Sequence, residues 1–149
     1  MRHIYRCPLR WADMDAYGHV NNVVFLRYLE EARIDFLFRP DKDFRQGSVV
    51  ARHEIDYKRQ LVHRHEPVDI ELWITEVRAA SFTLAYEVKD GDRIYVRAST
   101  VVVPYDFETQ RPRRITAEER EFLREYMDDG GPGDEGGTRD RDEEEAVAV

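Results

Sequence analysis

Apolar and polar residues follow two different periods in the first part of the chain. Residues 2 to 11 alternate with the period of a half-exposed strand. Pro8 has no backbone donor, so this strand should lie at a sheet edge or be interrupted there. From Asn22 to Pro40 the spacing becomes helical, and the apolar face is wider than a surface helix needs. We therefore expect one long, mostly buried helix whose apolar residues are Val23, Phe25, Leu26, Tyr28, Leu29, Ala32, Ile34, Phe36 and Leu37.

Four later segments alternate with the two-residue period of strands, and a shorter helix follows them. Asp90-Gly91 is a strong tight-turn signal, which predicts that the last three strands form an antiparallel meander. Thr116 and Glu119 have capping-box spacing, which predicts a helix start at Thr116. The order of elements favours an α+β fold in which one sheet wraps one helix, and the bare sheet edges favour an oligomer. The predicted strands are residues 48 to 57, 68 to 77, 81 to 89 and 93 to 104.

Charge is distributed unevenly along the 149 residues. The formal net charge is -8, but residues 128 to 149 alone hold nine acidic residues against two arginines. Residues 1 to 127 hold the other 22 acids and 21 bases. We expect one folded domain over residues 1 to 127 and a disordered acidic tail over 128 to 149, because the tail cannot bury enough apolar surface. The nearly neutral domain argues against a nucleic-acid partner.

The cysteine count and the lengths of the apolar segments exclude several classes of protein. Cys7 is the single cysteine, so an internal disulfide and a thiolate metal site are both excluded. No segment has the length of a membrane span or the apolar core of a secretion signal. We expect a cytoplasmic protein without a metal and without a membrane partner.

Residues 13 to 22, DMDAYGHVNN, place two carboxylates, a glycine, a histidine and two asparagines directly ahead of the long helix. One interpretation is purely structural: Gly18 makes the turn, and Asn21 or Asn22 caps the helix. A functional interpretation starts from the helix N-terminus, whose first amides carry partial positive charge and can stabilise an oxyanion. A carboxylate on the preceding loop could then act on the same carbonyl carbon, which is the minimum equipment for acyl transfer or hydrolysis.

The segment RWADMDAYGHVNNVVFLRYLEEAR resembles the opening of hotdog-fold acyl-CoA thioesterases of the 4-hydroxybenzoyl-CoA thioesterase type, whose pattern is D-x-D-x-x-G-H-V-N-N. VVARHEIDYKRQL, VRAASFTLAYEV and VVVPYDFETQRPRRIT are similar to later parts of the same family, so the resemblance covers roughly residues 3 to 126. It implies a hotdog fold, an antiparallel sheet of about five strands around one central helix. It also implies hydrolysis of an acyl-CoA to acid and CoA by a homo-oligomer, either a dimer or a dimer of dimers (a homotetramer).

The resemblance also implies roles for individual residues. Asp15 matches the catalytic carboxylate, and the backbone N–H of Asn22 matches the amide that polarises the thioester carbonyl. His19 and Asn21 match positions that shape the loop and form hydrogen bonds near the site, while Asp13 and Gly18 shape the loop. Arg78, ahead of Ser81, lies where the family usually has an arginine that binds the CoA phosphates, and we expect both residues to contact CoA. Further candidates, on charge and location only, are Lys58, Arg59, Arg111 and Arg113.

Several alternatives remain open at the level of sequence. Asp15 could attack the carbonyl or activate water, and the acyl carrier could be CoA or an acyl carrier protein. The same fold could serve a non-catalytic acyl-CoA binder or a hydratase or dehydratase, although the family's hydratases place Asp and His differently from D-x-x-G-H. No cofactor is expected, because CoA is part of the substrate.

Overall fold

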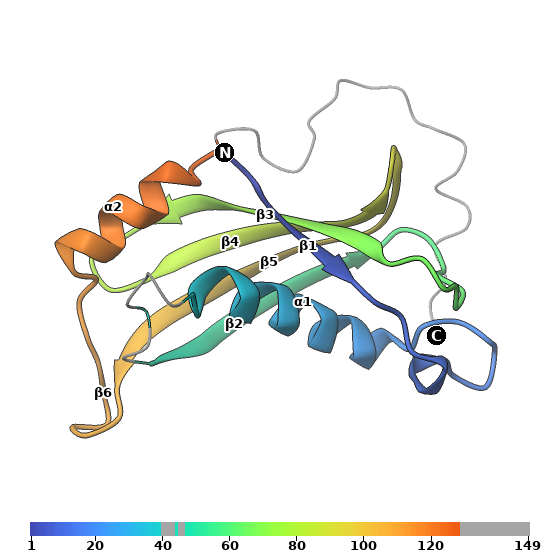
Figure 1. The fold of residues 1–149 in the computed structure, drawn as a ribbon. Helices are drawn as coiled ribbons and strands as arrows, with labels where there is room; N and C mark the ends of the chain where they lie inside the picture. The colour runs from blue at the N-terminus through green and yellow to red at the C-terminus, as the bar shows by residue number, and fades with distance from the viewer. Residues whose placement is uncertain (40–43, 45–46, 129–149) are drawn as a thin grey trace.

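A computed structural model describes residues 1–39, 44 and 47–128, and in it an antiparallel sheet packs against one long helix (Figure 1). The predicted α+β class and hotdog arrangement are confirmed, with a two-residue strand added to the five expected. The tail from residue 129 onward lies outside the described residues, so its disorder stays a prediction. The strands are β1 (His3–Cys7), β2 (Ser48–Tyr57), β3 (Val68–Val77), β4 (Phe82–Asp90), β5 (Arg93–Asp106) and β6 (Arg111–Pro112), and the helices are α1 (Asn22–Leu37), α2 (Ala117–Glu125) and the short 3-10 helix η1 (Trp11–Asp13).

Helix α1 begins where its cap residue predicts and buries most of the expected face. Phe25, Leu29 and Phe36 are almost fully buried. The expectation that Val23 and Ile34 extend this face is wrong, since 71% and 43% of their surfaces are exposed. Arg33 is buried instead, because its guanidinium donates to the Tyr86 hydroxyl at 3.3 Å and so has a polar partner in the interior.

The strand order is β1-β3-β4-β5-β2, with β4 at the centre of the sheet. The predicted meander of β3, β4 and β5 is confirmed, and β2 lies at the edge beside β5. Strand β1 forms the opposite edge but is shorter than predicted, because it ends at Cys7, before Pro8. Trp11 therefore lies outside the strand, in η1, with 77% of its surface exposed.

Strand β2 has the predicted bounds but not the predicted single face. A bulge shifts the register between Val50 and Arg52, so that Val50 pairs with Val102 and His53 with Thr100. Val50 and His53 consequently share the inner face, and the simple alternation over residues 49 to 57 is broken. A bulge cannot be recognised from a period of two, because it changes the side on which every later residue points.

The C-terminal segment closes one end of the sheet with α2, whose capping box is confirmed. The Thr116 hydroxyl accepts from the Glu119 N–H at 3.1 Å, and the Glu119 carboxylate accepts from the Thr116 N–H at 2.9 Å. Asp128, the first residue of the predicted tail, still binds Arg2 at 2.7 Å. No helix within the described residues could span a bilayer. The cytoplasmic location stays a prediction.

His3 connects β1 to the end of α1. Its Nε2 lies 2.7 Å from Asp35 Oδ2, and Arg39 Nη2 lies 2.5 Å from its Nδ1. A guanidinium can only donate, so Nδ1 accepts and the ring is neutral, with Nε2–H donating to Asp35. Burial is the main reason that the pKa of His3 is lowered from its ordinary value of 6.5.

Acidification should therefore weaken this connection. Because the pKa of His3 is lower in the folded protein than in the unfolded chain, its contribution to stability is fully present above pH 6.5 and is lost as the pH falls from there through the folded-state pKa. Urea unfolding at about pH 7.5 and about pH 5 should show a smaller loss of unfolding free energy on acidification for His3→Asn than for the wild type. Equal losses would show that His3 does not carry this pH dependence.

Candidate active site

The loop ahead of α1 is folded around the carboxylate of Asp15. Its Oδ1 accepts hydrogen bonds from the N–H of Tyr17 at 2.9 Å and of His19 at 3.3 Å. The Asp15 N–H donates to the His19 carbonyl at 2.8 Å, and the Asp15 carbonyl accepts from the Gly18 N–H at 3.1 Å. Gly18 has φ of +78°, a conformation that L side chains rarely adopt, so glycine is required by the turn itself. The loop thus positions the carboxylate, and the carboxylate in turn stabilises the loop.

Asp13 holds the loop to the helix. Its Oδ2 accepts from the Tyr28 hydroxyl at 2.6 Å, and its carbonyl accepts from the Asn21 N–H at 3.1 Å. Asn21 caps α1, since its Oδ1 accepts from the Val23 N–H at 2.9 Å. These contacts agree with the loop-shaping roles expected of Asp13, Gly18 and Asn21.

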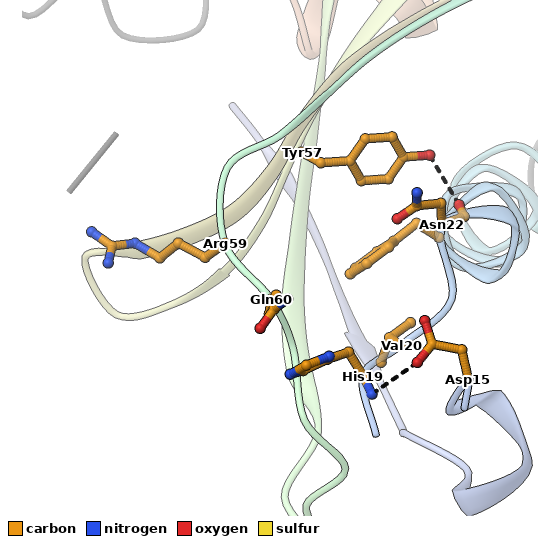
Figure 2. A pocket seen from close by; sticks show the side chains of 8 residues that line it. Asp15, His19, Val20, Asn22, Tyr57, Arg59 and Gln60 are labelled. Carbon is orange, nitrogen blue, oxygen red and sulfur yellow. Dashed lines mark hydrogen bonds between the residues drawn. The ribbon is translucent and has the colours of Figure 1, made fainter. Parts of the chain in front are cut away.

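Four of the predicted site residues line one pocket. Asp15, His19 and Asn22 come from the loop and the first residue of α1, and Figure 2 shows the second carboxylate oxygen of Asp15 directed toward the start of the helix. Arg59, two residues beyond the end of β2, also lines the pocket, but its guanidinium points away from Asp15 (Figure 2). The other lining residues are Val20, Phe25, Tyr57 and Gln60.

Sequence reasoning did not single out Tyr57 or Phe25 as site residues. Both occupy apolar positions of predicted elements, and such positions are usually core. The position of Tyr57 could nevertheless have indicated a site residue, because Tyr57 is the last residue of β2. Side chains at strand ends often lie beside functional loops.

The expected CoA-binding residues fall into two groups at opposite ends of the sheet. The N–H groups of Lys58 and Arg59 both donate to the Tyr95 carbonyl, at 2.8 and 3.1 Å, beside the pocket. Arg78 and Ser81 form the β3–β4 turn at the other end, where the Arg78 N–H donates to the Ser81 carbonyl at 2.8 Å. At about 3.3 Å per residue, the seven steps of β3 from Ile70, which lies level with Val96, to Val77 span roughly 23 Å.

Two further arginines lie at the distant end. Arg111 pairs with Asp106 in the short β5–β6 ladder and is exposed. Arg113 donates to both carboxylate oxygens of Glu119, at 2.7 and 2.9 Å, which makes it a structural cation rather than a surface one. One chain alone therefore does not gather the predicted CoA contacts at its pocket.

Neither the cysteine nor a metal cluster offers a competing reactive centre in the described part of the chain. Burial raises the pKa of the Cys7 thiol to about 12, so the reactive thiolate is scarce at neutral pH. Within residues 1–39, 44 and 47–128, no group of three His, Cys, Asp or Glu side chains is arranged to hold a metal ion. Asp15 is thus the carboxylate that combines a pocket position with a nearby helix N-terminus.

Comparison with known proteins gives the family. The model of the thioesterase-like superfamily matches residues 9–124, most of the folded domain. The chain belongs to the thioesterase-like superfamily. This confirms the predicted resemblance and the predicted class of enzyme, a thioester hydrolase.

Individual relatives of this thioesterase agree with the assignment. This chain is 32% identical to the uncharacterized protein YsmA of Bacillus subtilis over 123 residues, which cover 79% of this chain and 82% of YsmA. A predicted thioesterase from Bacillus stearothermophilus shares 27% identity with a TM-score of 0.79, covering 88% of this chain and all of that one (100%). A thioesterase from Thermus thermophilus, solved with coenzyme A and Zn, shares 30% identity with a TM-score of 0.72, covering 87% and 95% of the two chains.

Alanine at Gly18 should damage both stability and hydrolysis. A Cβ at Gly18 would meet no atom within 4 Å, so the cost comes from the positive φ alone, about 1–2 kcal/mol. Asparagine tolerates this conformation better, so Gly18→Asn should retain more stability and activity than Gly18→Ala.

Gly91 provides a matched control. It has φ of +57° and equally open surroundings, but it lies in the β4–β5 turn. Urea unfolding should show similar losses for Gly18→Ala and Gly91→Ala, while initial rates of thioester hydrolysis should fall only for Gly18→Ala. Equal rates in the two variants would show that the loop conformation does not matter for hydrolysis.

Proposed function

We propose that this thioesterase hydrolyses an acyl-CoA to the free acid and CoA, with Asp15 as the acting carboxylate and the backbone N–H of Asn22 as the oxyanion donor. The observation that carries the proposal is that Asp15 and Asn22 line the same pocket, with Asn22 as the first residue of α1. The helix N-terminus favours developing negative charge, and a carboxylate needs no second residue to become ionised at neutral pH.

The chemistry needs only these groups and water. In the general-base route, Asp15 takes a proton from water, and the resulting hydroxide adds to the thioester carbonyl while the Asn22 amide stabilises the oxyanion. The C–S bond then breaks, the acid is released, and the CoA thiolate takes the proton. In the nucleophilic route, an Asp15 oxygen adds to the carbonyl, and the C–S bond breaks to expel CoA thiolate and leave a mixed anhydride. Water then hydrolyses the anhydride to the free acid and the Asp15 carboxylate, and the proton released goes to the thiolate. Neither route requires a cofactor, and both require the same carboxylate.

Coenzyme A is the proposed carrier because its phosphates are anionic and cationic side chains lie at both ends of the sheet. The Thermus thermophilus relative was solved with coenzyme A, and we extend that ligand to this chain. Arg59 lies at the pocket, whereas Arg78 and Arg111 lie at the far end of the same sheet. A single acyl-CoA would meet both groups if two chains contributed to each site.

The exposed edge strand β2 offers a way to build such a site. Antiparallel pairing of two β2 strands about a two-fold axis would place the Tyr57 end of one chain beside the Ser48 end of the other. The partner's Arg78, Ser81 and Arg111 lie at that second end. We therefore propose a homodimer, alone or within a dimer of dimers, in which the catalytic residues of one chain face the CoA-binding cations of the other.

Replacing Asp15 with asparagine should nearly abolish hydrolysis. The amide oxygen can still accept from Tyr17 and His19, so the loop is kept while the charge is lost. Free-thiol release from short, long and aromatic acyl-CoAs should fall by at least about a hundredfold, as expected for loss of a general base. Asp92→Asn, in the β4–β5 turn, removes a carboxylate without touching the pocket and should retain activity.

Three outcomes would contradict this assignment. Wild-type rates in Asp15→Asn would show that another group acts on the thioester. Tight acyl-CoA binding by the wild type, with neither thiol release nor loss of enoyl-CoA absorbance, would indicate a non-catalytic binder, and loss of that absorbance without thiol release would indicate a hydratase.

The shared site can be tested by mixing two damaged chains. Asp15→Asn and the double variant Arg78→Ala/Arg111→Ala should each be weak alone, the second through a raised KM. Co-expression with two affinity tags allows mixed dimers to be purified, and each should have one intact site, about half the wild-type number. The unfractionated mixture, after random assortment, should have about a quarter. Absence of any recovery in purified mixed dimers would show that the two groups do not act across subunits.

A further inference from the structure

A tyrosine hydroxyl from the sheet is bonded to the first residue of α1. The Tyr57 hydroxyl donates to the Asn22 carbonyl at 2.9 Å, and Tyr57 also lines the pocket. Figure 2 shows the ring extending from the sheet toward the helix start, with the dashed bond at its tip. Burial raises the pKa of Tyr57, so the phenol stays protonated and able to donate at neutral pH.

This hydrogen bond acts on the residue whose amide is proposed to stabilise the oxyanion. The carbonyl and the N–H of Asn22 are parts of one residue, so a donor that fixes the carbonyl also limits rotation of the residue as a whole. First turns of helices fray readily, because their leading residues are held by few intrahelical bonds. A displacement of about 1 Å at a catalytic group can reduce a rate by about a hundredfold.

A second hydroxyl holds the other half of the site. Tyr28 donates to Asp13, and the Phe25 ring lies between the two tyrosines, with centroids 5.9 Å from Tyr57 and 5.9 Å from Tyr28. Burial raises the pKa of Tyr28, which keeps that hydroxyl a donor as well. The row of three rings thus connects the sheet, the helix start and the Asp15 loop.

We infer that Tyr57 is a positioning residue for thioester hydrolysis: its hydroxyl holds the first turn of α1 so that the Asn22 amide faces the carbon on which Asp15 acts. The inference rests on the proposed function and extends it to a residue that the family pattern D-x-D-x-x-G-H-V-N-N does not contain. Tyr57 acts through Asn22 rather than by touching the reacting atoms. It therefore affects the rate of the chemical step more than the affinity for substrate.

Tyr57→Phe removes the hydroxyl and keeps the ring that packs on Phe25. Its kcat should fall about ten- to a hundredfold, with KM and the unfolding midpoint close to the wild-type values. Tyr5→Phe removes a partly buried hydroxyl from β1, at the opposite edge of the sheet, and should leave kcat unchanged. A rise in KM at constant kcat would overturn the inference, since it would mean that Tyr57 contacts the substrate, and unchanged kinetics would overturn it as well.

A fluorinated tyrosine at position 57 separates hydrogen-bond donation from packing. Its phenol ionises at lower pH than tyrosine, and a phenolate cannot donate, so kcat should fall as the pH rises through that ionisation while the wild type shows no such fall. A pH profile parallel to the wild type would contradict the positioning role. The failure of this inference can be told apart from the failure of the proposed function. If Asp15→Asn is inactive while Tyr57→Phe is fully active, only the inference about Tyr57 is wrong. If Asp15→Asn hydrolyses at the wild-type rate, the proposed function is wrong.

Discussion

The position of the first turn of α1 is the constraint on which the site depends. Hydrogen bonds reach this turn from two sides: the loop contributes the Asn21 cap and the Asp13–Asn21 bond, and the sheet contributes Tyr57. The rest of the helix is held by burial of its apolar face against the sheet, so its axis is fixed by packing. The N-terminal end of α1 has these additional anchors, and one of them, Tyr57, also lines the pocket.

The role proposed for the Asp15 carboxylate combines two demands that usually conflict. A carboxylate stabilises a turn most when both of its oxygens accept hydrogen bonds from the turn. A catalytic carboxylate, by contrast, needs one oxygen that the substrate can reach. Here Oδ1 accepts both loop amides, and the second oxygen is directed toward the helix start. A carboxylate has lone pairs enough for both tasks, so one residue can serve each of them.

Local signals in the sequence predicted most of what is local in the structure. The start of α1 at Asn22, the capping box at Thr116 and the Asp90-Gly91 turn all depend on residues within a few positions, and all are confirmed. The β2 bulge was missed because register is decided by pairing with β5, which the strand's own alternation does not encode. The site was predictable in part for the same reason: Asp15, His19 and Asn22 lie within eight residues and line one pocket. Tyr57 comes from a strand far away in sequence, and its hydroxyl meets a carbonyl only in the folded chain.

The two edges of the sheet differ in a way that bears on where a second chain would bind. Strand β1 offers only five residues, is followed by Pro8, and is flanked by Arg2, which binds Asp128 and Glu87. Short strands, proline and charge are features that prevent edge pairing. Strand β2 offers ten residues, and apart from the bulge its ladder is regular. On its exposed edge, Arg52 and Glu54 form an ion pair. In a two-fold dimer, such residues of opposite charge could instead pair with those of the second chain. Because the pocket lies at the Tyr57 end of this same strand, an interface along β2 would bring the partner to the pocket, whereas an interface along β1 would place the partner at the opposite edge of the sheet.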